Sequence, residues 1–442
     1  MNAGLWAKQP YLLPVLSDER WQGYFNPTGP VGIVVLDAAA QRVLDAFDRP
    51  SSFEEAIACL EGMPDSAVRQ TAATLSSVGL LESATSPTGP RGRASSFAAW
   101  LHVSEACNLA CPYCYVEKRP QMMSPEAGIS AVARLVEIAC GHGYETLRLK
   151  YAGGEPTLNF SSIEAIHEYA LWRTAEAGLS LEEVILTNGV GVTDRMLDMM
   201  ANQGIDLMVS LDGDRAAHDR LRTRPNGKGT YAAVADTVAR AMDRGLRPDI
   251  SITLTALNLE GVPQAAAFAL ARDLPFSLNF YRECSTTGDL QAEPGQLVDT
   301  VLEVFDVIGA YPAYSPPLAG ILDRVRLDVP HRYACAAGRD YVTVDLQGEI
   351  AACQMLLGEP WSHLAAEDPL AEVQQRGEAI FKAVDERADC GYCPWQMACG
   401  GGCPLLWGST LHHTHCQVYQ ILLPTLARLE ARRLIARKEE IP

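Results

Sequence analysis

The sequence is short of positive charge and lacks any long apolar run. Its 36 lysine and arginine residues face 54 aspartate and glutamate residues, which leaves a formal net charge of -18. So acidic a surface repels nucleic acid and anionic membranes, and it either favours a basic peptide partner or serves solubility. No apolar run approaches the roughly 18 residues of a membrane-spanning helix, and the first residues lack the charged-then-apolar pattern of a signal peptide. We therefore expect a cytoplasmic protein with no nucleic acid and no membrane as partner.

The length and apolar content are those of an ordinary globular protein. At 442 residues and 48% hydrophobic composition, the chain has room for two or three domains with sizeable cores. Cysteines in a reducing compartment are metal ligands more often than disulfides, so the 13 cysteines indicate metal binding.

Three of the cysteines stand together in the run Cys-Asn-Leu-Ala-Cys-Pro-Tyr-Cys-Tyr. Cys107, Cys111 and Cys114 are predicted to lie on a loop just after a strand. Three thiolates can hold three irons of a [4Fe-4S] cluster and leave the fourth iron free to bind a small molecule. A zinc site is the alternative reading, but zinc sites usually pair their cysteines two by two.

This run resembles the signature of the radical S-adenosylmethionine (SAM) enzymes. The resemblance implies that the amino and carboxylate groups of SAM occupy the open iron. It further implies that reductive cleavage of SAM gives a deoxyadenosyl radical, which abstracts hydrogen from unactivated carbon. A reducing electron donor such as flavodoxin or ferredoxin is then required.

Short apolar runs alternate with helical patterns between residues 97 and 312, which predicts an α/β domain with a parallel sheet. Ser124, followed by Pro125, and Thr193, followed by Asp194, are good helix starts. The order resembles the partial (β/α)6 TIM-type barrel of the same family, in which loops at the C-terminal strand ends carry the chemistry. The predicted strands are residues 98–103, 146–151, 183–186, 206–211, 249–256 and 276–281.

Polar side chains follow the second, third and fourth predicted strands. Gly153 and Gly154 let the backbone approach a ligand closely, and Glu155 is an acceptor at a strand end. The resemblance assigns this Gly-Gly-Glu-Pro run to the amino group of SAM, and it assigns the backbone of Tyr113 to the adenine. The groups expected near the ribose or the methionine carboxylate are Asn188, Ser210 and Asp212.

The run from His218 to Arg222 resembles the family segment that supplies a carboxylate-binding arginine. Arg222 is the predicted residue, with Arg220 and Arg224 as neighbours that could serve instead. A solvated charged turn is the alternative.

Residues 1–90 read as a separate domain. Strands at Tyr11–Val15 and 32–36 precede helices at 38–47, 52–60 and 65–78, and Ser52 with Glu55 forms a capping box. This order resembles the winged-helix-like peptide-binding domain that is related to the peptide chaperone of pyrroloquinoline quinone biosynthesis. The resemblance implies that a leader peptide adds to the sheet edge as a strand. A structural cap or a degenerate helix-turn-helix is the alternative, and the turn-rich residues 83–95 form a linker.

A second group of cysteines lies in residues 331–442, which we expect to be a cysteine-rich iron-sulfur domain with a C-terminal helix. The spacing resembles the SPASM domain, the twin-cluster extension of radical SAM enzymes that mature peptides and proteins. The resemblance implies two auxiliary [4Fe-4S] clusters. One would be held by Cys390, Cys393, Cys399 and Cys416, and the other by Cys335, Cys353 and Cys403.

The fourth ligand of the second of these clusters is open, because residues 325–334 contain no cysteine. Cys284, at the end of the sixth predicted strand, and His331 are candidates, although a lone cysteine is more often a buried small hydrophobe. Cys59 and Cys140 are expected to pack inside amphipathic helices, and the histidines 412, 413 and 415 to be loop residues.

No residue stands out as the catalytic base. The family's sulfatase maturases place an aspartate after the second SPASM cysteine, where this chain has Gln354, which is not a base. Glu283 and Asp345 are weak candidates with little to separate them from solvated carboxylates.

Together these patterns predict a radical SAM oxidoreductase that modifies, and most simply crosslinks, a ribosomally made precursor peptide. The N-terminal domain would bind the leader, the barrel would generate the radical, and the SPASM domain would oxidise or position the core peptide. The alternatives are a radical SAM enzyme that matures a protein or acts on a small molecule, and a non-catalytic metal-binding peptide-interaction protein.

Overall fold

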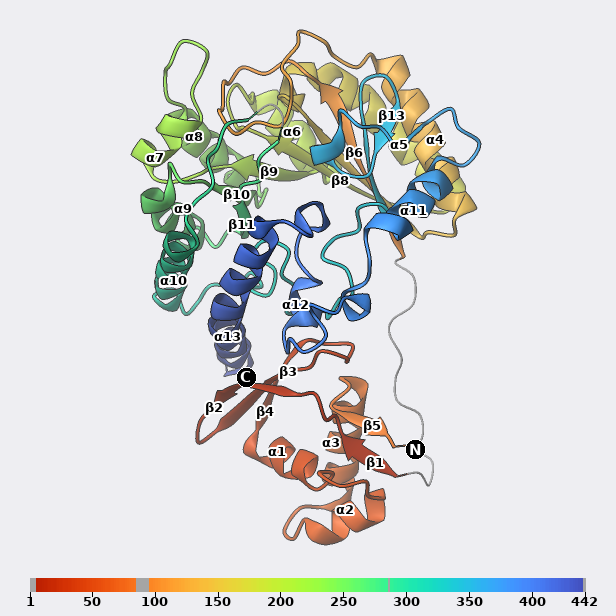
Figure 1. Ribbon diagram of the computed structural model, residues 1–442, viewed down its shortest axis with the longest axis vertical. Coiled ribbons are helices and arrows are strands. Elements are labelled where there is room, and N and C mark those ends of the chain that lie inside the picture. The colour runs from red at the N-terminus through yellow and green to blue at the C-terminus, as the bar shows by residue number, and fades with distance from the viewer. Residues whose placement is uncertain (1–4, 85–94, 285–286, 440–442) are drawn as a thin grey trace. The chain divides into compact units, whose positions relative to one another are not determined.

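The computed structural model describes residues 5–84, 95–284 and 287–439, so most of the predicted linker lies outside the described residues. The chain divides into two compact units. The first comprises residues 1–92, 309–335 and 383–442, and the second comprises residues 93–308 and 336–382. Figure 1 labels the elements of both.

The second unit is built on one open sheet with the strand order β11-β10-β9-β8-β7-β6-β12-β13-β14. All six predicted strands are present, and each pairs in parallel with the next, which agrees with a partial barrel. They are β6 (Ser96–Ser104), β7 (Thr146–Gly153), β8 (Ser180–Thr187), β9 (Asp206–Ser210), β10 (Asp249–Leu254) and β11 (Phe276–Phe280).

A seventh parallel strand comes from the region that we assigned to the cysteine-rich domain. Strand β12 (Tyr341–Val344) pairs with β6, and β13 (Glu349–Ala351) and β14 (Ser362–His363) follow it as an antiparallel extension. Residues 336–382 therefore fold together with the barrel strands.

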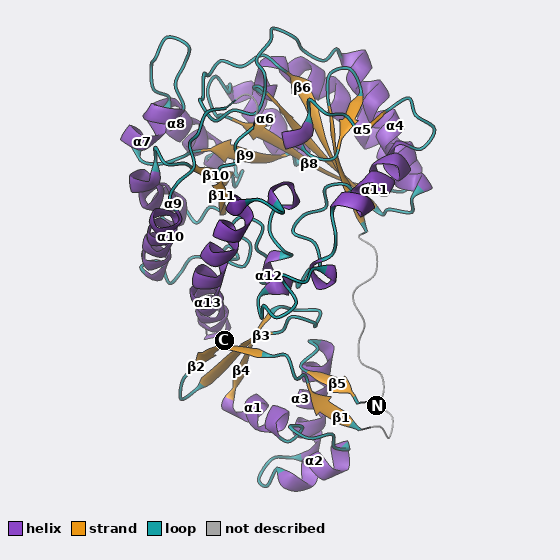
Figure 2. Cartoon of the chain, in the orientation of Figure 1, coloured by secondary structure: helices purple, strands orange, loops and turns teal. Residues whose placement is uncertain are grey.

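Buried and half-buried side chains alternate along the strands, and the helices cover the face that carries the buried ones. In β6, Phe97, Ala99 and Leu101 are fully buried, whereas Ala98 and Trp100 on the other face are half-buried. Ser124 caps the first helix of this unit, as predicted. Figure 2 shows the helices beside the row of strands. They are α4 (Pro125–Gly141), α5 (Phe160–Ala177), α6 (Asp194–Gln203), α7 (Arg215–Leu221), α8 (Tyr231–Met242), α9 (Val262–Leu270), α10 (Pro294–Gly309) and α11 (Pro369–Ile380).

In the first unit, the N-terminal segment forms a three-stranded antiparallel sheet and three helices. The helices occur as predicted, and Ser52 and Glu55 make the expected capping box. Their core includes the fully buried Leu44 and Phe47, each of which stabilises the fold by about 1.5–3 kcal/mol. The elements are β1 (Trp6–Lys8), β2 (Leu13–Ser17), β3 (Trp21–Phe25), β4 (Ile33–Asp37), α1 (Ala38–Asp45), α2 (Phe53–Cys59), α3 (Asp65–Ser77) and β5 (Leu81–Ser83).

The central strand of this sheet, β3, was not predicted. Gln22 and Gly23 interrupt its apolar pattern. A Cβ on Gly23 would lie 3.1 Å from Leu16 Cβ, a tight contact, and 3.4 Å from Ala431 Cβ, so the strand packs closely against a distant helix. A contact with a residue about four hundred positions away leaves no local signal in the sequence.

That distant residue belongs to the C-terminal helix α13 (Thr410–Glu439), which follows the short helix α12 (Gln396–Cys399) and packs on the same sheet. Phe25 of β3 stacks on Trp395, with ring centroids 5.4 Å apart. Inside the unit, Glu430 accepts two hydrogen bonds of 2.7 Å from Arg433 and one of 3.0 Å from Leu318 N–H.

Two expectations about single residues are wrong. The histidines 412, 413 and 415 lie in the first turns of α13, where Ser409 Oγ accepts the His412 N–H at 3.2 Å as a helix cap would. Cys59 and Cys140 are in helices as expected, but both are exposed, because the apolar stripe of each helix passes beside them. Among the described helices, none combines the length and apolarity that crossing a bilayer requires.

Candidate functional site

The cysteine run lies on a loop directly after β6, as predicted. Cys107, Cys111 and Cys114 are all half-buried there. Two N–H groups point at the sulfur of Cys107: the backbone of Leu109 at 3.4 Å and the side-chain amide of Asn188 at 3.8 Å. Such donors suit a thiolate that carries negative charge.

Burial favours the neutral form of two of these thiols. It raises the pKa of Cys107, and it raises the pKa of Cys111 to about 11, with Lys118 and Arg222 acting in the opposite direction. At these two positions the apoprotein therefore favours neutral thiols, and metal ions would supply the positive charge that holds thiolates. Among the described residues, no three His, Cys, Asp or Glu side chains are grouped to hold one metal ion. The ligands of a four-iron cluster surround the whole cluster, so they lie farther apart than the ligands of a single metal ion. Three thiols on one loop are compatible with such a cluster.

The two glycines of the Gly-Gly-Glu-Pro run lie against the start of the cysteine loop. Gly154 N–H donates to Ser104 O at 2.6 Å, and Glu155 N–H donates to Ala106 O at 2.8 Å. A Cβ on Gly153, whose φ is +136°, would lie 2.0 Å from Ser104 O, and one on Gly154 would lie 2.4 Å from Ala106 O. The close approach that requires glycine here is therefore between β7 and the segment leading to Cys107.

Glu155 is fully buried, and four protein donors satisfy its carboxylate. Oε1 accepts from Thr157 N–H at 3.1 Å, Thr157 Oγ1 at 2.6 Å and Thr187 Oγ1 at 2.7 Å, and Oε2 accepts from Asn188 N–H at 2.8 Å. Burial raises the pKa of Glu155, and these four hydrogen bonds lower it. The side chain thus joins the loops after β7 and β8.

Asn188 continues this connection toward the cysteines. Its Nδ2 donates to Asn108 Oδ1 at 2.8 Å as well as facing Cys107, and its Oδ1 accepts from Val190 N–H at 2.8 Å. Three predicted site residues, Cys107, Glu155 and Asn188, are therefore brought together.

A second group forms around Asp212, just after β9. Its carboxylate accepts from the Tyr113 hydroxyl, from Arg222 Nε at 2.5 Å and from Thr253 N–H at 2.8 Å. The Arg222 guanidinium also lies over the Tyr113 ring, 5.4 Å from its centroid. Burial would lower the pKa of Arg222, but Asp212 raises it above its ordinary value, so the guanidinium stays charged. Ser210 is the last residue of β9 and precedes Asp212 by two positions. Its side chain is half-buried.

Sequence reasoning placed Tyr113, Asp212 and Arg222 in one site without predicting that they bond to one another. It missed His218, whose Nδ1 accepts Asp212 N–H at 3.3 Å and whose Nε2 lies 3.1 Å from Thr230 Oγ1. His218 lies in the run that suggested Arg222. The available signal was a histidine six positions after Asp212, at the spacing of a helix that begins just after that aspartate.

Comparison with known proteins fits this geometry. Residues 101–269, which include the cysteine loop and both groups, match the Radical SAM superfamily. The chain contains a radical SAM domain. A relative by sequence is the GTP 3',8-cyclase of Parasynechococcus marenigrum, which is 35% identical over 153 residues. That alignment covers 33% of this chain and 41% of the cyclase, so it concerns less than half of either protein.

Solved structures share the fold over a larger part of the chain. Native anSMEcpe with bound AdoMet and the Cp18Cys peptide has a TM-score of 0.62 and 15% identity, and covers 78% of this chain and 100% of its own. Streptococcus suis SuiB bound to precursor peptide SuiA has a TM-score of 0.50 and 16% identity, and covers 92% of this chain and 97% of its own. At these identities the likeness is one of fold.

Five of the C-terminal cysteines meet in the first unit, outside the radical SAM domain. Their side chains line one cavity, into which His412, His415 and Tyr419 also face: Cys390, Cys393, Cys399, Cys403 and Cys416. Burial raises the pKa of Cys390 and Cys416, and it raises that of Cys399 to about 12. The side-chain amide of Gln420 faces Cys416 Sγ at 3.6 Å and Cys393 Sγ at 4.0 Å. Thiols grouped with an N–H donor are a donor set that suits an iron-sulfur cluster.

The remaining predicted ligands of the auxiliary clusters belong to different units. Cys335 ends one segment of the first unit, and Cys353 lies in the second. His331, of the first unit, is half-buried, and the loss of hydration lowers its pKa to about 4. Cys284 is half-buried, and its N–H donates to Thr287 Oγ1 at 3.0 Å.

The weak candidates for a base differ in their surroundings. Asp345 accepts the N–H groups of Gln347 at 2.9 Å and Glu349 at 2.8 Å, so it holds the β12–β13 turn. Gln354 accepts from the Tyr341 hydroxyl at 2.8 Å. Glu283 is exposed. These hydrogen bonds indicate that Asp345 stabilises the turn between β12 and β13.

Proposed function

We propose that this chain is a radical SAM enzyme that modifies, by oxidative crosslinking, a ribosomally made precursor peptide. The observation that carries the proposal is the loop with Cys107, Cys111 and Cys114, placed after the first strand of a domain that matches the Radical SAM superfamily. When bound, a [4Fe-4S] cluster with SAM on its open iron would supply a deoxyadenosyl radical.

The chain's own residues would build the SAM site in two parts. Glu155 and Asn188 fix the loops after β7 and β8 against Cys107. Asp212 fixes Tyr113, whose backbone is the predicted adenine contact, and holds Arg222, whose charge acts to lower the pKa of Cys111. Gly153, Gly154, Ser210 and Arg222 complete the set that we propose as cofactor contacts.

A cavity lined by five thiols supports the proposal of auxiliary clusters. A substrate radical must lose an electron to become a stable product, and a second cluster could accept that electron. We keep Cys390, Cys393, Cys399 and Cys416 as ligands of one auxiliary cluster and Cys335, Cys353 and Cys403 as ligands of the other, with Cys284 or His331 as candidates for the remaining position.

Peptide as the substrate class is supported by the two folds that resemble this chain. The anSMEcpe structure contains the Cp18Cys peptide, and the SuiB structure contains the precursor peptide SuiA. The N-terminal elements β2–β4 and α1–α3 would bind the leader.

Anaerobic reconstitution tests the catalytic part of the proposal. The wild-type protein should bind iron and sulfide and release deoxyadenosine from SAM under reducing conditions. Replacing Cys107, Cys111 and Cys114 by alanine should remove about four iron ions per chain and abolish deoxyadenosine release. Retained SAM cleavage in that variant, or zinc in place of iron in the wild type, would refute the assignment.

Co-expression with candidate precursor peptides tests the substrate. A crosslink removes two hydrogens, so mass spectrometry should show a loss of about 2 Da for each bond formed. An unchanged mass for every candidate would count against crosslinking.

The sequence likeness to a GTP cyclase favours a second candidate, a radical SAM enzyme that acts on a small molecule. Deoxyadenosine release that is independent of any peptide but stimulated by a nucleotide would support it. Deletion of residues 1–90 would not separate the candidates cleanly, because Phe25 and Gly23 pack on Trp395 and α13, and deletion exposes that face.

A further inference from the structure

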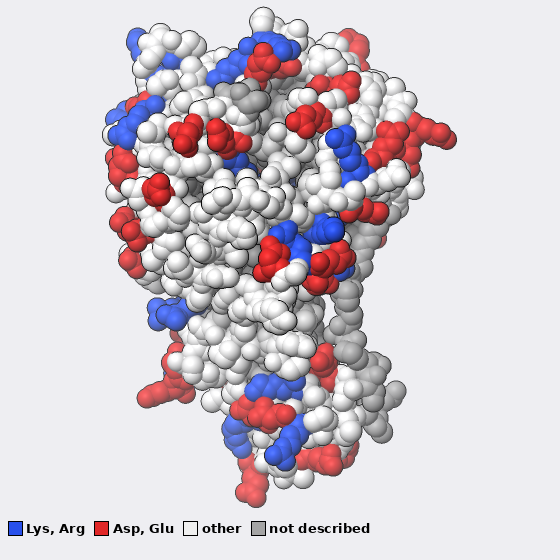
Figure 3. Space-filling view, in the orientation of Figure 1, with Lys and Arg blue, Asp and Glu red and all other residues white. Residues whose placement is uncertain are grey.

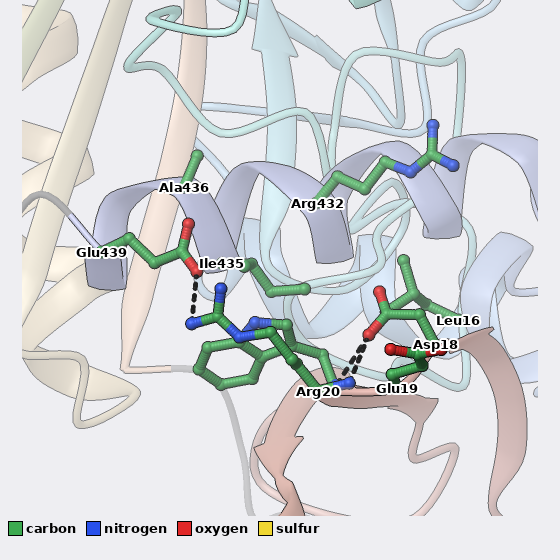
Figure 4. A pocket seen from close by; sticks show the side chains of 9 residues that line it. Leu16, Asp18, Glu19, Arg20, Arg432, Ile435, Ala436 and Glu439 are labelled. Carbon is green, nitrogen blue, oxygen red and sulfur yellow. Dashed lines mark hydrogen bonds and ion pairs between the residues drawn. The ribbon is translucent and has the colours of Figure 1, made fainter.

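The hollow between the β2–β3 turn and the end of α13 is a surface with balanced charge (Figure 4). Together with the cavity that adjoins it, the hollow is lined by three acidic and three basic side chains. Arg20 pairs with Glu439 at 3.2 Å, and the Asp18 carboxylate accepts the N–H groups of Arg20 and Trp21 at 2.9 and 2.8 Å. This surface therefore selects no ligand by charge.

Hydrogen-bonding groups without a protein partner lie instead in the second unit, on the face of the barrel sheet that the helices do not cover. Trp100 and His102 of β6 are on this inner face, since alternate residues of a strand share a face. Lys150 of β7 pairs in register with Trp100, and its Nζ lies 5.6 Å from the centroid of the Trp100 ring. The Tyr341 ring of β12, on the other side of β6, meets Trp100 edge-on with 6.1 Å between centroids. The inner face thus gathers side chains from three neighbouring strands.

Gln354, which directly follows the predicted cluster ligand Cys353, is joined to this face through its side-chain oxygen. The Tyr341 hydroxyl donates to Gln354 Oε1 at 2.8 Å, and the buried Thr343 hydroxyl lies 3.1 Å from the same Tyr341 oxygen. Within the described part of the chain, the NH2 group of Gln354 has no hydrogen-bond partner. Because its oxygen is engaged, the Gln354 side chain offers two N–H donors to a ligand.

A buried histidine on the same face also lacks a partner. His102 is 3% exposed, and its Nε2 forms no hydrogen bond with any residue that the structure describes. The His102 ring contacts the ring of Tyr115, which follows Cys114, with 6.0 Å between centroids. Burial raises the pKa of Tyr115, and negative charge on Cys114 and Cys353 raises it further, so both sulfur atoms act on this one tyrosine. Buried polar atoms are normally paired, so the unpaired imidazole indicates that a ligand completes the inner face.

The charge on the inner face is matched, so a ligand is recognised there by hydrogen bonds. Burial raises the pKa of Asp249, of β10, to about 6, and Lys150 acts in the opposite direction. The Lys150 ammonium therefore has an anion near it and does not select an anionic ligand. The donors of Gln354 require an acceptor, and the acceptor that every peptide carries is a carbonyl oxygen.

We propose that the side-chain amide of Gln354 donates a hydrogen bond to a carbonyl oxygen of the precursor peptide and so positions the residue that is modified. That the ligand is a peptide rests on the proposed function. The donor role rests on the hydrogen bond from Tyr341, which engages the amide oxygen. An amide cannot accept the proton that leaves when a crosslink forms, so Gln354 is a substrate-positioning residue and not the missing base.

Steady-state kinetics with the full-length, anaerobically reconstituted protein test this inference. The probe is the precursor peptide in which the wild type forms a crosslink on co-expression. Gln354→Leu removes the donor, and Gln354→Glu puts an anionic acceptor in its place while keeping an oxygen for Tyr341. We expect the KM for the peptide to rise about fivefold or more in Gln354→Leu and about tenfold or more in Gln354→Glu. The value of kcat should change less than KM, because the hydrogen bond is made with the bound peptide before and during reaction.

Two further variants separate the donor from the fold. Gln347→Glu makes the same chemical change at an exposed position in the β12–β13 turn and should keep the wild-type KM. Tyr341→Phe leaves the amide in place but removes the hydrogen bond that orients it, so its KM should lie between those of the wild type and Gln354→Leu. Equal iron content in all of these proteins shows that each is folded and loaded.

Peptide variants identify the carbonyl group. Each Asn, Asp, Gln and Glu near the modified residue is replaced by alanine in turn. If one replacement makes the KM values of the wild type and Gln354→Leu equal, the carbonyl belongs to that side chain. If the difference persists in every peptide, the carbonyl belongs to the main chain. Both results support a carbonyl acceptor.

Three results would overturn the inference. The first is a KM in Gln354→Leu equal to that of the wild type, and the second is an equal rise of KM in Gln347→Glu. The third is a shift in the reduction potential of a cluster in Gln354→Leu without any change of KM, because the amide would then donate to the cluster. A wild type that modifies no peptide would refute the proposed function itself, so the two failures are distinguishable.

Discussion

Arg222 and Asp212 form a buried ion pair in which Arg222 Nε donates to the carboxylate at 2.5 Å. Both side chains come from the segment after β9, yet the same carboxylate also accepts the Tyr113 hydroxyl from the cysteine loop. The pair therefore fixes the position of the loop that would hold the cluster, in addition to any contact with a cofactor.

Loss of the Asp212 charge should destabilise the second unit strongly. Asp212→Asn leaves the buried Arg222 without a counter-ion, which costs about 3–5 kcal/mol. Tyr113→Phe removes one hydrogen bond and keeps the ion pair, so it should cost about 1 kcal/mol. Urea unfolding followed by circular dichroism measures both. Similar small losses in the two variants would show that the ion pair does not support the fold.

Substitution of Glu155 should weaken SAM binding without contact between the side chain and SAM. Glu155→Gln replaces one acceptor oxygen by an NH2 group, which is a donor. That NH2 group must face other donors, either the hydroxyls of Thr157 and Thr187 or the N–H of Asn188. We expect affinity for SAM to fall about tenfold, since both loops lose their common anchor. Equilibrium dialysis measures it, and Glu164→Gln, an ion-paired residue on α5, serves as the control. Unchanged affinity would remove Glu155 from the site.

The stability of the second unit should depend on pH through His167, a buried residue of α5. Burial lowers the pKa of His167, but its Nδ1 faces Glu183 at 2.6 Å, and the net pKa lies above 6.5. A raised histidine pKa means that the native state binds the proton more tightly than the unfolded state does. The stabilisation is therefore complete below pH 6.5 and is lost as the pH rises through the raised value.

His167→Gln keeps a donor toward Glu183 and cannot titrate. The free energy of unfolding of this variant should depend less on pH than that of the wild type at and above pH 6.5, in urea titrations at several pH values. His413→Gln, at an exposed position of α13, should behave as the wild type. Parallel pH profiles for all three proteins would contradict the assignment.

Gln420 should tune the reduction potential of the proposed auxiliary cluster. Its amide faces Cys416 Sγ and Cys393 Sγ, and hydrogen bonds to ligand sulfurs stabilise the reduced cluster. Gln420→Leu should therefore lower the potential of one cluster in a redox titration followed by electron paramagnetic resonance. The control Gln417→Leu changes an exposed residue three positions earlier on α13 and should leave the potential unchanged. Identical potentials in both variants would separate Gln420 from the cluster.

On the surface, the sequence predicted total charge but not its distribution. On the face drawn in Figure 3, acidic and basic side chains are interspersed with wide neutral areas. Arg428 and Arg432 come from a helix at the C-terminus and meet Pro14 and Leu16 near the N-terminus only in the folded chain. A surface made from two ends of a sequence has no signature in composition.

The sequence by itself determined the features that depend on neighbours a few residues apart. Alternation along Phe97, Ala99 and Leu101 specified a strand, Ser52 with Glu55 specified a helix start, and the spacing of Cys107, Cys111 and Cys114 specified a loop of thiols. Only the tertiary structure decided that Gly153 and Gly154 lie against Ser104 and Ala106, that β12 joins the barrel strands, and that β3 packs on α13. Each of these is a pairing between segments distant in the chain, and its free energy depends on close packing that no local pattern of residues encodes.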